Sequence, residues 1–310
     1  MGSFLGHALP GSFFLVAGLW WFVHVILEYK GRLKLSISSE RQRSWKNVPA
    51  TRCLRKIPFE PLVKIIAAAV GVCVELWRVH WSMVDEHNQF QSPNKFGHAA
   101  MYGFFAFSGL VEVLNFYKLT HLSREAEYTV LAAAFGSEGM LFYFHLHGRD
   151  MFDVRIHTIL FLVIFMTAIV ILLEACLPKH QLELFMARTV LCLTQGTWFW
   201  EIAFTIYGPH RWIARDAETM PEKEVMLDTA VVTVNICWHV LGWSGVMLVC
   251  FIITSCLHKR GQLSSSCLSN TSNVGNNSDE IKELDEEIGL LKNDYKCNNG
   301  NEMKEDSEQF

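Results

Sequence analysis

The sequence predicts an all-α integral membrane bundle of seven transmembrane helices. Runs of about twenty mostly apolar residues, the length that crosses roughly 30 Å of hydrocarbon, recur as far as Leu257. Of the 310 residues, 51% are hydrophobic, and the runs lack the polar faces that helices of a soluble protein present to water. Basic residues gather in one segment after the first run, as they do in cytoplasmic loops of membrane proteins.

Five of the runs are almost free of charge and are the clearest predicted helices. They are Leu9–Leu27, Phe96–Phe116, Tyr128–Phe144, His157–Leu177 and Val225–Leu257. The last is long enough to tilt or to extend beyond the bilayer. Two further runs, Phe59–Trp77 and Leu182–Tyr207, contain charged residues and complete the set of seven.

The two charged runs are still predicted to span the membrane. Lys64 and Glu75 lie near the two ends of the first, where a long side chain can reach the interface. In the second, Glu183 and Arg188 lie near its start, so only Gln195 and Glu201 place polar groups well inside the run.

Positive charge sets the predicted orientation. The segment after the first run is strongly basic and is therefore expected in the cytoplasm. Its basic residues are Lys30, Arg32, Lys34, Arg41, Arg43, Lys46, Arg52, Arg55 and Lys56. Seven spans then place the N-terminus in the lumen or outside the cell and the C-terminus in the cytoplasm. The opening "MGSFLGHALPGS" has no basic region, so the first run is expected to be a retained span and not a signal peptide.

The composition changes after residue 258, which divides the chain into a predicted transmembrane domain (1–258) and a cytoplasmic tail (259–310). From residue 261 onward there are eleven acidic residues and four lysines, a balance of minus seven that is typical of disorder. Within the tail, "EEIGLL" places Glu286 before Leu290 and Leu291. This pattern resembles the acidic dileucine signal by which clathrin adaptor complexes select cargo for endosomes and lysosomes.

Polar residues inside the spans fall into two groups by their expected depth. Glu112 and Glu174 lie toward the cytoplasmic ends of their runs, where we expect basic loop residues to pair with them. A larger group falls in the outer half of the membrane despite being spread along most of the chain. It comprises His7, Glu75, His98, Glu138, His145, His147, His157, Glu201, Asn235 and His239.

Helical spacing narrows the outer group to a candidate site. Glu138 and His145 are seven residues apart and share a helix face, and Asn235 and His239 are four apart. We therefore predict a lumenal pocket whose metal ligands are histidines on four helices, surrounded by polar and aromatic groups. The predicted ligands are His98, His145, His157 and His239, with Glu138, Glu201, Asn235, Trp198 and His147 as surrounding or second-layer residues.

Three chemistries remain open for this pocket. Imidazoles with a carboxylate suit Zn²⁺ or iron, and zinc with one open position activates water for hydrolysis of a lipid amide or ester. The same residues also suit a structural polar network, or a site that handles protons or a ligand as histidines titrate near pH 6. No Gly-rich phosphate loop, Ser-His-Asp signature or nucleic-acid motif occurs in the sequence.

Five separated blocks of sequence resemble the transmembrane protein 45 family. They are "GHALPGSFF" from Gly6, "FYFHLHGRDMFD" from Phe142, "QGTWFW" from Gln195, "CWHV" from Cys237 and "GLLKN" in the tail. The resemblance covers nearly the whole chain and implies a multispanning protein of Golgi, endosomal and lysosomal membranes, which agrees with the dileucine pattern. It implies no activity.

Two enzyme families with membrane histidines serve as comparisons. Seven-helix zinc hydrolases of the ceramidase and adiponectin-receptor type carry an HxxxH pair in the last helix, whereas this chain has Asn235 and His239 there. Di-iron desaturases use HxxxH and HxxHH boxes, which this chain lacks. The leading hypothesis is therefore a non-enzymatic membrane protein that responds to pH or to a ligand. The alternatives are a zinc- or iron-dependent lipid hydrolase or oxidoreductase and, third, a seven-helix receptor.

Overall fold

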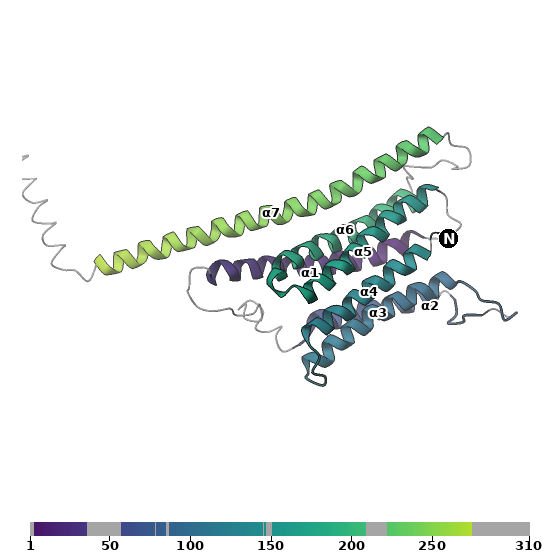
Figure 1. Cartoon of the computed structure of the whole chain (residues 1–310), viewed down its shortest axis with the longest axis horizontal. Coiled ribbons are helices and arrows are strands. Elements are labelled where there is room, and N and C mark those ends of the chain that lie inside the picture. The colour runs from purple at the N-terminus through teal and green to yellow at the C-terminus, as the bar shows by residue number, and fades with distance from the viewer. Residues whose placement is uncertain are drawn as a thin grey trace, which may run out of the picture. The chain divides into compact units, whose positions relative to one another are not determined.

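The computed structural model contains seven long α-helices and no strand within the residues it describes, which confirms the all-α prediction (Figure 1). The structure describes residues 3–35, 57–77, 79–84, 87–144, 146, 151–208 and 222–274. For 34–35, 222–229 and 262–274 it describes the backbone alone. The helices are α1 (Phe4–Leu35), α2 (Phe59–Trp77), α3 (Pro93–Phe116), α4 (Arg124–Phe144), α5 (Met151–Cys176), α6 (Gln181–Tyr207) and α7 (Glu222–Val274). A single 3₁₀ turn, η4 (Pro178–His180), joins α5 to α6.

The helix ends follow the apolar runs closely in the middle of the chain and differ at its two ends. Helix α2 has the predicted bounds, while α1 begins at Phe4, five residues before the expected Leu9, and continues through Pro10. Helix α7 continues to Val274, past the expected domain boundary at residue 258. The chain forms two compact units, Met1–Ile252 and Ile253–Phe310, and the sorting residues Glu286, Leu290 and Leu291 lie outside the described residues.

Four helices are long and apolar enough to cross a membrane by length and composition alone. These candidate spans are Phe4–Leu33, Pro93–Phe116, Met151–Cys176 and Ala230–Gly261, within α1, α3, α5 and α7. Helices α2, α4 and α6 have 19, 21 and 27 residues, which is also sufficient length to cross a bilayer, but they are not among these four candidates. Several of their charged residues have polar partners inside the bundle, as described below.

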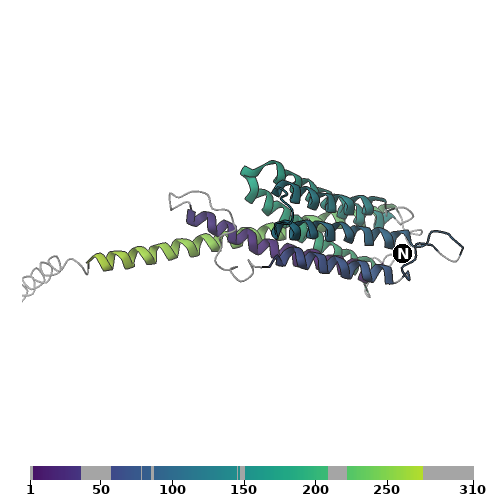
Figure 2. The ribbon, with the colours of Figure 1, turned by 90° about the horizontal axis from the view of Figure 1, so that it is seen from below.

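The helices of the first unit pack mainly as α1 on α6, α2 on α3, and α5 on both α4 and α6 (Figure 2). Helix α3 also packs on α4, whereas α1 and α2 meet in only a few places. Neighbours run antiparallel, since Gly11 approaches Phe199 while Gly18 approaches Leu193. The two ends of the bundle therefore each collect residues from many parts of the chain.

Glycine permits the close approach of α1 and α6. A Cβ on Gly196 would lie 2.8 Å from the backbone nitrogen of Leu15 and 3.1 Å from the carbonyl oxygen of Gly11. A Cβ on Gly18 would lie 2.8 Å from Leu193. Small residues at such a contact allow two backbones to pack directly, which is how helices associate where lipid removes the hydrophobic driving force.

Aromatic residues fill the centre of the first unit. Phe14 of α1 stacks on Phe199 of α6 with ring centroids 5.8 Å apart, and Phe135 of α4 packs edge-on against Phe105 of α3 at 5.1 Å. Trp198 is fully buried, and its indole donates a hydrogen bond to the carbonyl oxygen of Ile156 at 3.1 Å. This core separates a polar layer at the end that holds the N-terminus from a second polar layer at the other end.

Candidate functional site

Two histidines from distant parts of the chain meet at the N-terminal end of the bundle. His7 of α1 and His157 of α5 place their Nε2 atoms 3.0 Å apart, and both side chains are buried. The Nδ1 atom of His7 lies 3.0 Å from the carbonyl oxygen of Ser3. The Nδ1 atom of His157 lies 2.8 Å from the carbonyl oxygen of Asp153 and 2.7 Å from its carboxylate.

The contacts of the two Nδ1 atoms restrict where the ring protons sit. Carbonyl and carboxylate oxygens only accept hydrogen bonds, so each Nδ1 must carry its proton. In neutral imidazole the other nitrogen then has a lone pair and no proton. The Nε2 lone pairs of His7 and His157 therefore point at one another across 3.0 Å, an arrangement that is stable only with a cation between them.

Aromatic rings enclose the pair. Tyr207 stacks on His7 with centroids 5.0 Å apart, and Phe199 packs at 6.4 Å. Phe142 lies 6.5 Å from the ring of His157 and also 6.5 Å from the ring of His98. These apolar walls keep the pair away from solvent, with the Asp153 carboxylate as the negative charge beside it.

The other predicted residues form three separate contacts. His98 pairs with Glu75 of α2, with Nδ1 and Oε1 3.3 Å apart. Between α6 and α7, Asn235 donates to Glu201 at 3.4 Å, while Nδ1 of His239 lies 2.8 Å from the hydroxyl of Thr197. His239 also packs edge-on against Trp198 at 5.5 Å. Glu138 accepts a hydrogen bond from Gln195 at 2.9 Å in the centre of the bundle.

The predicted four-histidine ligand set stays a prediction. Among the described residues, no group of three or more His, Cys, Asp or Glu side chains has a geometry that could hold a metal ion. His145 and His147 are not described, and His98, His157 and His239 each have a different partner. Trp198 and Glu201 of α6 contact His239 and Asn235 of α7, respectively.

Sequence reasoning missed His7 and Asp153 as members of the site. Sequence analysis placed His7 in the outer group of polar residues but not in the candidate site, and α1, which begins at Phe4, includes it. Asp153 was missed even though it lies four residues before His157, which is the spacing of one helical turn.

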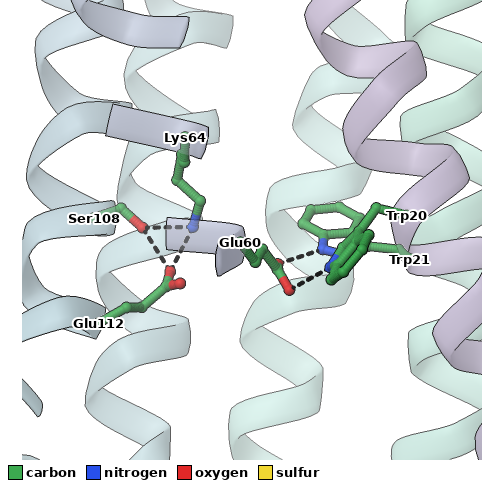
Figure 3. A network of polar contacts seen from close by, with 6 residues as sticks. All are labelled: Trp20, Trp21, Glu60, Lys64, Ser108 and Glu112. Atoms are coloured by element: carbon green, nitrogen blue, oxygen red, sulfur yellow. Dashed lines mark hydrogen bonds and ion pairs between the residues drawn. The ribbon is translucent and has the colours of Figure 1, made fainter. Parts of the chain in front are cut away.

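A second polar layer lies at the opposite end of the bundle (Figure 3). Both indoles of the Trp20–Trp21 pair in α1 donate to one carboxylate, Glu60 of α2, at 3.0 and 2.6 Å. In Figure 3, Lys64 reaches from α2 to Glu112 of α3, and Ser108 donates to the same carboxylate at 3.3 Å. These contacts tie α2 to α1 and to α3.

The same end holds a buried ion pair between α5 and α6. Nε of Arg188 lies 2.9 Å from Oε2 of Glu174, and both side chains are almost fully buried. The guanidinium lies over the ring of Trp21, 4.3 Å from its centroid, so Trp21 contacts both Arg188 and Glu60. Among the described residues, the partners of Glu112 and Glu174 are the helix residues Lys64 and Arg188, whereas most of the basic loop that was expected to pair with them lies outside the described residues.

The chain is similar to a family of unknown function and to several membrane proteins. Residues 124–252 match the model of a family of unknown function, DUF716. The chain is 26% identical over 278 residues to transmembrane epididymal protein 1 of Rattus norvegicus, covering 84% of this chain and 83% of that one. It is 23% identical over 221 residues to transmembrane epididymal protein 1 of Homo sapiens, covering 68% and 75%.

The similarity to DUF716 thus covers residues 124–252 of the chain. The DUF716 segment contains α4, α5, α6 and the first part of α7, and therefore includes Glu138, His157 and His239. His7 lies outside it. The family description assigns no activity, while the names of the relatives agree with the apolar helices in indicating a membrane protein.

Proposed function

We propose that this chain is a multispanning membrane protein in which His7 and His157 bind one small cation that ties α1 to α5. The observation that carries the proposal is the pair of Nε2 atoms 3.0 Å apart, with both Nδ1 atoms on oxygen acceptors. Seven spans, with the N-terminus in the lumen and the C-terminus in the cytoplasm, are part of the proposal.

Two cations fit this chemistry, a proton and a transition-metal ion such as Zn²⁺. A shared proton makes an N–H···N hydrogen bond, for which 3.0 Å is an ordinary length. Two imidazoles on a tetrahedral zinc ion, with Zn–N near 2.05 Å, stand about 3.3 Å apart. The observed separation of the Nε2 atoms therefore favours a shared proton over a zinc ion. In this form His157 is the imidazolium, beside the carboxylate of Asp153.

The proton form makes the pair responsive to acid. With one proton, His157 donates and His7 accepts. With a second proton both rings are donors, and two positive charges face each other 3.0 Å apart. Besides the two histidines, the ionisable groups that contact the pair among the described residues include Asp153 of α5 and Tyr207 of α6. Adding a second proton by strong acidification is therefore expected to weaken the contact between α1 and α5.

The proposed location is the membrane of Golgi, endosomal or lysosomal compartments, whose acidic lumen would act on this end of the bundle. Membership of the transmembrane protein 45 family is part of the proposal and would imply this location. Clathrin adaptors are the proposed partners of Glu286, Leu290 and Leu291, besides the bilayer itself. The chain is proposed to act without catalysis; a lipid hydrolase or oxidoreductase with zinc or iron is the alternative.

The test is metal analysis and thermal denaturation of the purified full-length protein at neutral pH and at about pH 5. We expect the melting temperature of the wild type to fall by several degrees at the lower pH. His7→Gln should be much less sensitive, because a neutral amide donates to Nε2 of His157 without a cation. His121→Gln, at an exposed position, is the control and should behave like the wild type.

Metal content decides between the two cations. Metal-free wild type with the acid response supports the proton. Stoichiometric zinc or iron that is lost in both His7→Gln and His157→Gln supports the metal form and the enzymatic alternative. A metal-free protein in which wild type and His7→Gln respond equally to acid would overturn the proposal.

A further inference from the structure

A lone carboxyl group is buried in the centre of the bundle, away from the histidine pair. Glu138 of α4 has an exposed fraction of 0%, and Gln195 of α6 is equally buried. The amide nitrogen of Gln195 donates to Oε1 of Glu138 at 2.9 Å. Within the described residues, Oε2 of Glu138 and Oε1 of Gln195 have no hydrogen-bond partner.

The helices around Glu138 supply no positive charge. Of the ionisable groups on the described helices, those that face it are Tyr102 of α3 and Cys192 of α6, both buried and neither cationic. On α5, Ile164 and Phe161 face the neighbouring Gly139, and on α1 Phe14 packs on Phe135. A buried carboxylate without a cationic partner is very costly, so the charge must be balanced or removed.

The donors and acceptors of Glu138 and Gln195 show that one hydrogen-bond donor is missing between them. An ionised carboxylate is only an acceptor, and so is the amide oxygen of Gln195. The two unpartnered atoms are thus both acceptors, and no donor among the described residues serves either. One proton on Oε2 would turn it into a donor, and the amide oxygen of the same Gln195 is an acceptor that lacks a donor. The acid and the amide would then form two hydrogen bonds in a ring.

We infer that Glu138 and Gln195 form a proton-binding site in the core of the bundle, separate from the His7–His157 pair. Glu138 holds the proton on Oε2 and donates it to Oε1 of Gln195 in the folded protein. Carboxylic groups that hold a proton inside a helical bundle are the elements from which membrane proteins build proton relays. Glu138 lies one helical turn from Phe142, which packs against His157, so the two sites are close in depth.

Infrared spectroscopy of the purified full-length protein tests the inference directly. The wild type should show the C=O band of a protonated carboxyl group at neutral pH, shifted in D₂O and absent in Glu138→Gln. Glu183→Gln changes an exposed carboxyl on α6 and should keep the band. If the wild type and Glu138→Gln show the same spectrum in this region, Glu138 is ionised and the inference is overturned.

Thermal stability adds a second readout. Glu138→Gln is neutral and similar in shape, so its melting temperature should lie close to that of the wild type. Glu138→Ala leaves the amide of Gln195 unpaired beside a cavity and should melt many degrees lower. The melting temperature is also compared in sodium and in choline salts. If the wild type is more stable in sodium and Glu138→Gln is not, the site binds a metal cation, and the inference of a bound proton is overturned.

Discussion

Replacing Arg188 by leucine is expected to destabilise the protein by about 3–5 kcal/mol, the cost of leaving a buried charge without its partner. Glu174 would then be a carboxylate 2% exposed, with its ion pair removed. The ring of Trp21 would also lose the guanidinium that lies over it. Unfolding of the purified protein in detergent, by heat or by denaturant, measures the loss.

The double variant Glu174→Leu/Arg188→Leu separates a charge effect from loss of packing. Removing both charges leaves no buried ion, so the double variant should be markedly more stable than Arg188→Leu alone. Arg32→Leu removes the partly exposed ion pair with Glu28 and should change stability by less than about 1 kcal/mol. A double variant as unstable as the single one would show that the pair stabilises through shape and not through charge.

Replacing Gly196 by alanine is expected to separate α1 from α6 and to cost about 1–3 kcal/mol. The added Cβ would lie 2.8 Å from the backbone nitrogen of Leu15, so a backbone must move to accept it. Because α1 carries His7, the same variant should also weaken the contact with His157 and reduce the acid response. Thermal denaturation at the two pH values measures both effects.

Gly136→Ala is the matched control for Gly196→Ala. Gly136 lies inside α4, and a Cβ there would meet nothing within 4 Å. Alanine favours the helix over glycine by roughly 0.5–1 kcal/mol, so this variant should be neutral or slightly more stable. Equal destabilisation by both substitutions would contradict the close α1–α6 contact.

The helices were predictable because the signal for each is spread over about twenty residues. The apolar run of α2 had the observed bounds, and those of α3 and α4 had the observed C-terminal ends. The extent of α7 was not predictable, since residues after 258 are polar and give no apolar signal for the helix that reaches Val274. That all seven helices span the bilayer stays a prediction, with α1, α3, α5 and α7 as candidate spans by length and composition.

The depth of a polar side chain along its helix was easier to predict than the residue it contacts. Counting residues along antiparallel helices placed His157 in one layer and Glu112 and Glu174 in another, and contacts with His7, Lys64 and Arg188 agree with that division. The partners themselves depend on helix rotation and on which helices are neighbours. Glu60 illustrates this, because nothing local indicates that two tryptophans of α1 would donate to it.

Nitrogen-15 NMR of the histidine-labelled full-length protein tests the central claim most directly, with His7→Gln and His157→Gln used to assign the two rings. The account predicts that both rings carry a proton on Nδ1, and that one cation is shared between the Nε2 atoms. Finding either ring as the neutral tautomer protonated only on Nε2 would contradict it, because an ordinary hydrogen bond would then join the rings without any cation.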